Sequence, residues 1–297
     1  MTLTPLPQLS KSVNASNLIA KWSFENSVAD TKGGLVGVAK NASYIAGVKG
    51  QAYLGSSTQE RYAVYNNATE VGAISSFSFC FWMKSGQTVP DGGAPGQGKG
   101  VQGIFALVNP AGFWGGINLF IENPDGAKPN TLRLKMDIEN HRPGVAWGGQ
   151  GPMFYIDGAI DTWIQVVLTY DAASSRYTVY KNGEKGTTSI YGTPYGPFND
   201  LNGSCILYAD NPGGPGGSNG NPSSAPLYGA LVFNTPNLSQ LVIGSNQFST
   251  TPSLTTTHGD EGWATDYAGA LDEFRIYKSA LTSSEVMALY KLEKTNR

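Results

Sequence analysis

The chain has 297 residues with 38 glycines and 17 prolines, and only 14% of its residues are charged. Its net charge of −2 at pH 7 provides no electrostatic footprint for nucleic acid or an anionic membrane surface, so we expect neither partner. No run of about 20 apolar residues occurs, and no segment is predicted to span a bilayer.

The N-terminal residues predict a tail rather than part of a folded core. Residues 1–16 are polar and contain prolines, so we expect a tail or linker there and one domain over residues 17–297. The first residues, Met-Thr-Leu-Thr-Pro-Leu-Pro, lack the basic start and apolar centre of a secretory leader. Because Met1 could follow a removed leader, we still expect a secreted, periplasmic or outer-surface protein.

Strand signals begin at Leu18, and the clearest is Phe-Ser-Phe-Cys-Phe-Trp-Met-Lys at residues 77–84. The apolar side chains at 77, 79, 81 and 83 alternate with the others, which predicts a half-buried strand. Further strands are predicted at residues 103–108, 116–122, 131–139, 163–170, 175–181, 205–208, 241–244 and 270–277.

Turn and cap signals connect these strands. Residues 171–174 predict a short hairpin connection, and Asn182-Gly183 predicts a second turn. Two segments, 85–102 and 211–226, are too rich in glycine to be strands and predict long loops. The capping box from Thr282 to Glu285 predicts one helix at the end of the chain. Many short strands with one terminal helix predict an all-β sandwich or jelly roll.

The two cysteines, Cys80 and Cys205, each lie within an apolar run. This context favours buried free thiols, and a single disulfide between them is the alternative.

Four segments in this order resemble a known family. They are residues 18–34 (opening Leu-Ile-Ala-Lys-Trp-Ser-Phe-Glu), 77–82, 163–183 and 269–285 (opening Gly-Ala-Leu-Asp-Glu-Phe-Arg-Ile-Tyr). Together they are similar to the bacterial type of laminin-G-like jelly roll in the concanavalin A-like lectin/glucanase superfamily. The resemblance implies two curved antiparallel sheets with a short C-terminal helix. It does not imply one activity, because this architecture occurs in lectins, adhesion modules, hydrolases and lyases.

The resemblance also implies a structural calcium ion. Asp272, at the start of the last strand, matches the position of a calcium ligand in this superfamily, and Asp30 is the best partner near the first strand. Calcium prefers six to eight oxygen ligands, which carboxylates and loop carbonyls supply. The alternative is that Asp272 caps a turn. Glu273 is expected to pair with Arg275 or to face solvent.

Catalytic signals are weak. Laminarinase-like glucanases of the superfamily carry Glu-x-Asp-x-(x)-Glu on one strand, and here Lys135 occupies the position of the nucleophile in Lys135-Met-Asp137-Ile-Glu139. Without that carboxylate, double displacement cannot occur at this site. His141 and the segment from His258 to Trp263 are weaker candidates for a base, and both are more typical of polar loops.

The aromatic residues give a stronger functional signal. Trp22, Trp82 and Trp163 lie in predicted strands and are expected to pack, whereas the other three tryptophans lie in glycine-rich loops. Sugar rings stack on aromatic planes, and polar side chains bind their hydroxyls. We therefore expect a sugar platform with hydroxyl partners beside it, formed by Trp114, Trp147, Trp263, Tyr155 and Tyr195 with Asn118, Asp125 and Asn140.

These signals favour a non-catalytic carbohydrate-binding module of a secreted or bacterial cell-surface protein, with a glycan as its partner. A glycoside hydrolase or polysaccharide lyase is one alternative, and a protein–protein adhesion module is another.

Overall fold

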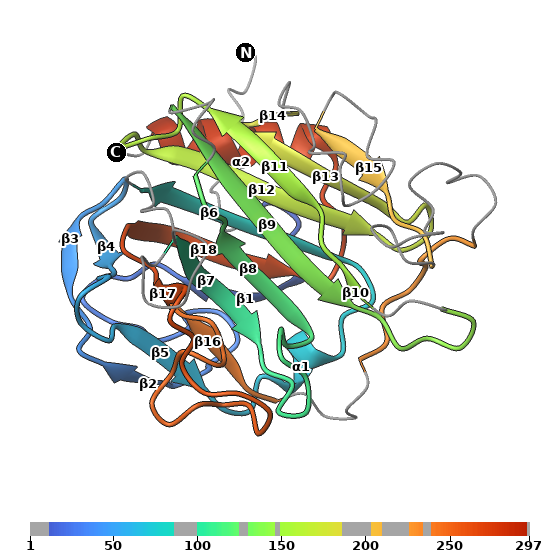
Figure 1. Ribbon diagram of the computed structural model, residues 1–297. Coiled ribbons are helices and arrows are strands. Elements are labelled where there is room, and N and C mark those ends of the chain that lie inside the picture. Colours follow the sequence, from blue (N-terminus) through green and yellow to red (C-terminus); the bar gives the residue numbers. More distant parts are fainter. Residues whose placement is uncertain are drawn as a thin grey trace, which may run out of the picture.

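The computed structural model shows two stacked β-sheets with a helix near the C-terminus (Figure 1). This arrangement confirms the predicted all-β sandwich. The structure describes residues 12–85, 100–124, 130–145, 149–185, 203–209, 226–233 and 239–295.

The first sheet has nine strands within the described residues. Its order is β14 (Glu184–Lys185), β13 (Arg176–Lys181), β12 (Ile164–Asp171), β6 (Phe77–Lys84), β18 (Ala270–Tyr277), β4 (Gln51–Leu54) and β3 (Tyr44–Ala46). β1 (Leu18–Trp22) also pairs with β18, and β15 (Ser204–Ile206) pairs with β13. All these pairs are antiparallel, and β18 joins the two ends of the domain by pairing with β1.

The second sheet also has nine strands in the described part of the chain. Its order is β10 (Gly149–Gln150), β9 (Thr131–Glu139), β8 (Ile117–Ile121), β7 (Val101–Leu107), β16 (Leu241–Ile243), β5 (Tyr62–Tyr65) and β2 (Gly37–Lys40). β11 (Met153–Asp157) pairs with β9, and β17 (Ala264–Asp266) runs parallel to β7. The helices are α1 (Thr69–Gly72) and α2 (Ser283–Thr295).

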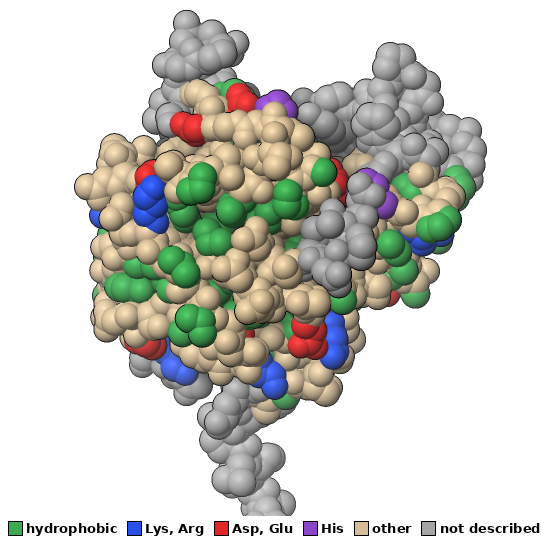
Figure 2. Space-filling model, turned by 90° about the horizontal axis from the view of Figure 1, so that it is seen from below, with side chains coloured by type: hydrophobic (Ala, Val, Ile, Leu, Met, Phe, Trp, Pro, Cys, Tyr) green, Lys and Arg blue, Asp and Glu red, His purple; other side chains and the backbone are tan. Residues whose placement is uncertain are grey.

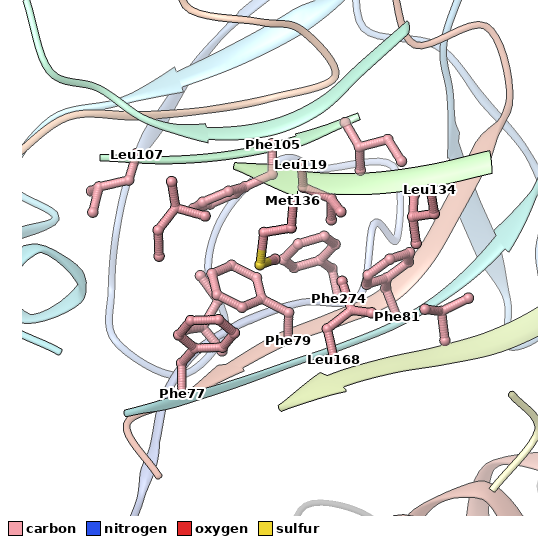
Figure 3. Close-up of a cluster of buried hydrophobic side chains, with 14 of the residues drawn as sticks. Phe77, Phe79, Phe81, Phe105, Leu107, Leu119, Leu134, Met136, Leu168 and Phe274 are labelled. Atoms are coloured by element: carbon pink, nitrogen blue, oxygen red, sulfur yellow. The ribbon is translucent and has the colours of Figure 1, made fainter. Parts of the chain in front are cut away.

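The main core lies between the two sheets and is rich in phenylalanine (Figure 3). Phe79 of β6 meets Phe105 of β7 across the layers, with their ring centroids 4.9 Å apart. Phe274 of β18 stacks on Phe81 at 5.1 Å and on Phe105 at 6.0 Å. The alternating apolar positions of β6 therefore point inward as the sequence predicts.

The opposite face of β6 is buried as well, which differs from the half-buried strand that the sequence predicts. α2 packs over this face, where Val286 and Leu289 join Cys80 in a second apolar cluster. Trp82 lies under the same helix, and its indole N–H donates to the Glu293 carboxylate over 2.7 Å. The alternation of residues along β6 does not show that a helix from the chain end covers this face.

A buried ionic network links β1, β18 and α2. Arg275, which is fully buried, forms ion pairs with Glu273 and with Glu293. Lys21 of β1 reaches the same Glu273 at 2.9 Å. Burial alone would raise the pKa of Glu273, but Arg275 and Lys21 lower it below its ordinary value. The expected pairing of Glu273 with Arg275 is confirmed, and Glu273 does not face solvent.

The two adjacent carboxylates of β18 face different surroundings because the strand bulges between Asp272 and Arg275. Glu273 is the extra residue of this bulge and has a left-handed backbone with φ of 49°. The bulge allows Glu273 to reach Arg275 and Lys21, while Asp272 accepts a hydrogen bond from the Lys49 amide at 2.9 Å.

Several local predictions are confirmed. In the capping box, the Thr282 amide donates to Glu285 over 2.8 Å, and the Glu285 amide donates back to the Thr282 hydroxyl over 3.3 Å. Asn182 and Gly183 both have positive φ, as the turn between β13 and β14 requires. Cys80 and Cys205 are buried and free.

The chain reaches the domain before residue 17. Val13 is buried in the cluster under α2, so the described residues of the predicted tail contact the domain. Within the described residues, no helix is long and apolar enough to cross a membrane.

Candidate functional site

The candidate site lies on the outer face of the second sheet. Strand alternation turns Leu134 and Met136 of β9 into the core and leaves Lys135 and Asp137 on the outer face. On the neighbouring strand β8, Phe120 lies opposite Lys135 and Asn118 lies opposite Asp137. This face therefore carries an aromatic ring, an ammonium group, an amide and a carboxylate within two adjacent strands.

Two loops far apart in the sequence cover part of this face, and Gln247 holds them together. Its amide donates to the carbonyls of Asn109 and Phe113 over 3.1 Å, and the Asn109 amide donates to its oxygen over 2.8 Å. Gly115, with φ of 87°, lets the first loop return to β8, and a Cβ there would lie 2.7 Å from the Leu107 carbonyl oxygen. These contacts fix the position of Trp114.

Trp114 lies at the centre of an aromatic cluster. Its ring stacks on Phe120 at 5.4 Å with an interplanar angle of 10°, and Trp263 approaches it at 5.7 Å. Phe113 stacks on Phe248 at 4.6 Å, and the His258 ring meets Phe113 edge-on at 4.3 Å. Phe113, Trp114 and Trp263 are half-buried, so this cluster presents aromatic surface to solvent while its base packs on the sheet.

A polar row runs beside the aromatic cluster on β9. The Lys135 ammonium lies 3.3 Å from Asp137 and 5.7 Å from the centroid of the Trp114 ring, so it connects the two groups. Burial raises the pKa of Asp137 to about 6, and Lys135 opposes this shift. Further along the row, Glu139 lies 3.2 Å from the His141 ring and accepts from the Asn109 amide group.

The structure brings two of the three predicted loop tryptophans together. Trp114 and Trp263 are 149 residues apart in the sequence and lie in one cluster beside Asp137. Trp147, Tyr195 and Asp125 lie outside the described residues.

The other predicted residues are buried. Tyr155 packs on the outer face of β11, where its ring meets the Arg133 guanidinium. Asn140 uses all four of its hydrogen-bonding positions on backbone groups, namely those of Arg142, Tyr228, Ala230 and Val232. Asn118 is also fully buried, but neither atom of its amide group has a hydrogen-bond partner. Asn140 therefore supports the loops, whereas Asn118 retains unused hydrogen-bonding capacity.

Sequence reasoning missed Phe113, Phe120 and Phe248 as parts of the cluster. Phe113 directly precedes Trp114 in a glycine-rich loop, which was an available signal. Phe120 shares the outward face of β8 with Asn118, so alternation could have placed it. For Phe248 the sequence offers no comparable signal, because its position depends on the contacts of Gln247.

The predicted calcium ligands differ in how well they fit an ion. Each oxygen of Asp30 accepts two backbone N–H groups, from Lys21, Lys32, Gly33 and Leu35, so this carboxylate is already saturated. Asp272 accepts the Lys49 amide at Oδ2, while its Oδ1 is buried without a hydrogen-bond partner. Asp272 therefore retains one oxygen that could face a cation, whereas Asp30 retains none.

Comparison with known proteins relates the chain to others at the level of fold. Neither the protein-family models nor the curated proteins give a match. Among solved structures, the receptor-binding domain of botulinum neurotoxin type G aligns with 93% of this chain and 51% of its own, at a TM-score of 0.54 and 15% identity. A structure of botulinum neurotoxin type C, whose cell entry is dependent upon interaction with two ganglioside molecules, aligns with 95% of this chain and 53% of its own. Its TM-score is 0.54 and its sequence identity is 15%.

A third structure, domain 4 of the arabinanase AbnA from Geobacillus stearothermophilus in complex with arabinotriose, aligns with 92% of this chain and 98% of its own, at a TM-score of 0.49 and 17% identity. This alignment is too weak to support an argument. The chain spans about half the length of the two neurotoxin structures that it matches. The likeness establishes the fold alone. The laminin-G-like subdivision stays a prediction.

Proposed function

We propose that this chain is a non-catalytic glycan-binding module of a secreted or surface-displayed protein. The observation that carries the proposal is the convergence of Trp114 and Trp263 on the outer face of the second sheet. Half-buried indoles held by packed loops form a rigid surface on which the C–H face of a sugar ring can stack. Asn118 and Asp137 lie beside this surface with unpartnered polar atoms, which supports the recognition of hydroxyl groups.

The comparison supports a glycan as ligand only in general terms. The cell entry of botulinum neurotoxin type C, which shares the fold, is dependent upon interaction with two ganglioside molecules. A hydrolase remains the less favoured alternative, because Lys135 pairs with Asp137 where a glucanase would need a second carboxylate.

A protein-adhesion role is supported by a different surface. Val36 and Val38, at the edge strand β2, are 78% and 68% exposed. Figure 2 shows a face of the molecule on which hydrophobic side chains gather near the middle and charged ones lie toward the edges. Exposed apolar side chains on an edge strand favour contact with another protein.

The direct test of glycan binding is retention on gels that contain polysaccharides. We expect the Trp114→Ala variant to bind its glycan about 10- to 100-fold more weakly than the wild type, because the stacking surface is lost. Trp114→Phe should retain part of the affinity. Trp163→Ala, which changes a half-buried tryptophan beside β12 in the other sheet, is the matched control and should leave binding unchanged. Equal binding by Trp114→Ala and Trp163→Ala variants of unchanged melting temperature would refute the site.

We also propose that calcium binds at Asp272, with backbone carbonyls as its other ligands. The buried and unpartnered Oδ1 of Asp272 supports this proposal. Within the described residues, no group of three or more His, Cys, Asp and Glu side chains could hold a metal, so the ion would depend on carbonyl oxygens. Bound calcium would balance the negative charge of the buried Asp272 carboxylate.

A further inference from the structure

The cationic groups near the candidate site are already engaged by the protein. Lys135 is 7% exposed, and its ammonium lies between Asp137 and the faces of Trp114 and Phe120. Arg133 donates to the Asn123 carbonyl over 2.7 Å and lies over the Tyr155 ring.

Two further basic side chains, Arg142 and His141, lie near the same edge of the sheet. Arg142 donates to the carbonyls of Leu227 and Tyr228, and the His141 ring lies 3.2 Å from Glu139. An acidic sugar needs a cation that can turn toward its carboxylate or sulfate. Among the described residues, Lys135, Arg133 and Arg142 already direct their charged groups to other groups of the protein, and the His141 ring lies against Glu139.

In contrast to these engaged basic groups, two polar side chains of the site have atoms without a hydrogen-bond partner. Asp137 Oδ2 is buried and has no hydrogen-bond partner, and both atoms of the Asn118 amide group are in the same state. The two residues are register partners on neighbouring strands, which places their side chains about 5 Å apart on one face. Such atoms are costly to leave unpaired. A carboxylate and an amide side by side can accept from one hydroxyl and donate to the next.

The carboxylates around Asp137 also disfavour a negatively charged ligand. Glu122 and Glu139 both lie close enough to Asp137 to raise its pKa, after the larger effect of burial. A negatively charged sugar stacked on Trp114 would therefore meet three carboxylates of the described residues, whereas the nearest ammonium is covered by aromatic rings. Like charges at short range disfavour binding.

We propose that the site selects neutral glycans over acidic ones, with adjacent sugar hydroxyls binding between Asn118 and Asp137 beside the Trp114 surface. This inference rests on the proposed glycan-binding function and specifies its ligand class. Because Asn118 is fully buried, hydroxyls reach its amide group only if the segment that covers it moves outward.

The test is affinity electrophoresis of the whole chain against two sets of polysaccharides at equal concentration. The neutral set is arabinan, galactan, xyloglucan and mixed-linkage β-glucan, and the acidic set is polygalacturonate, alginate and hyaluronan. We expect retention by at least one neutral polysaccharide and at least 10-fold weaker binding to every acidic one. Asn118→Ala should weaken binding to the neutral polysaccharides about 10-fold at an unchanged melting temperature. Asp137→Asn should reduce the difference in affinity between the neutral and the acidic polysaccharides.

The outcomes separate this inference from the proposed function. Preferential or equal retention by acidic polysaccharides would overturn the neutral preference and leave glycan binding in place. Unchanged affinity in a folded Asn118→Ala variant would also overturn it, because the amide would then bind only buried water. Retention by no polysaccharide, including a broader glycan array, would remove both proposals.

Discussion

Arg275→Ala is expected to destabilise the fold by about 3 to 5 kcal/mol. Arg275 is fully buried between Glu273 of the bulge and Glu293 of α2, so its removal leaves two buried carboxylates with less compensating charge. Lys21 still reaches Glu273, and the Trp82 indole and the Gln165 amide still donate to Glu293. These contacts limit the loss without replacing the guanidinium. Thermal unfolding should show a decrease in Tm on the order of 10 °C.

Lys278→Ala is the matched control for this prediction. Lys278 follows β18 directly and pairs with Glu70, but both side chains are exposed, at 45% and 59%. An exposed pair contributes at most about 1 kcal/mol. If the free energies of unfolding of the two variants agreed within about 1 kcal/mol, the buried network would not anchor α2 to the sheet.

Asp272→Asn is expected to change how stability depends on pH. Burial raises the pKa of Asp272 to about 7, compared with an ordinary value of 3.8. Between these values the folded state holds a proton that the unfolded state releases, so this group's contribution to stability falls as pH rises from about 4 to about 7. The difference corresponds to about 4 kcal/mol. In chelator, we expect Asp272→Asn to be more stable than the wild type above pH 7 and equal to it near pH 4.

Calcium provides a second arm of the same measurement. If calcium binds Asp272, adding it at pH 7.5 should raise the Tm of the wild type and leave that of Asp272→Asn unchanged. Chelator has the opposite effect on the wild type. A stability difference between the two proteins that stays constant from pH 4 to pH 8 would contradict the buried, proton-binding state of Asp272. A wild-type Tm that does not respond to calcium would refute the ion.

Local patterns predicted much of this fold. The alternation over residues 77–84 predicted β6 with its inward phenylalanines, and predictions at 131–139 and 270–277 match β9 and β18 residue for residue. The capping box predicted the start of α2. These features depend on neighbours in the sequence, so the sequence alone carries them.

Features set by distant contacts were harder to predict. The strands at residues 51–54 and 62–65 were missed because four-residue runs carry little periodicity. Burial on both faces of β6 depends on a distant helix, whose Glu293 lies 211 residues after Trp82 in the sequence. The contact between Lys21 and Glu273 at the bulge likewise joins distant parts of the chain.

The candidate site was only partly predicted, because its assembly also depends on contacts between distant parts of the chain. Residue type and loop context indicated Trp114 and Trp263, but their meeting depends on Gln247, which binds one loop to the other. Asn118 was selected as a polar residue near the platform, and its burial opposite Asp137 follows only from the pairing of β8 with β9.

The central claim is that a glycan stacks on the cluster of Trp114 and Trp263. The most direct test is NMR of the tryptophan indole N–H groups while the retained polysaccharide is titrated into the protein. The indole signals of Trp114 and Trp263 should shift as the glycan binds, while those of the buried Trp22 and Trp82 should stay in place. Binding that shifts neither the Trp114 nor the Trp263 signal would contradict the account.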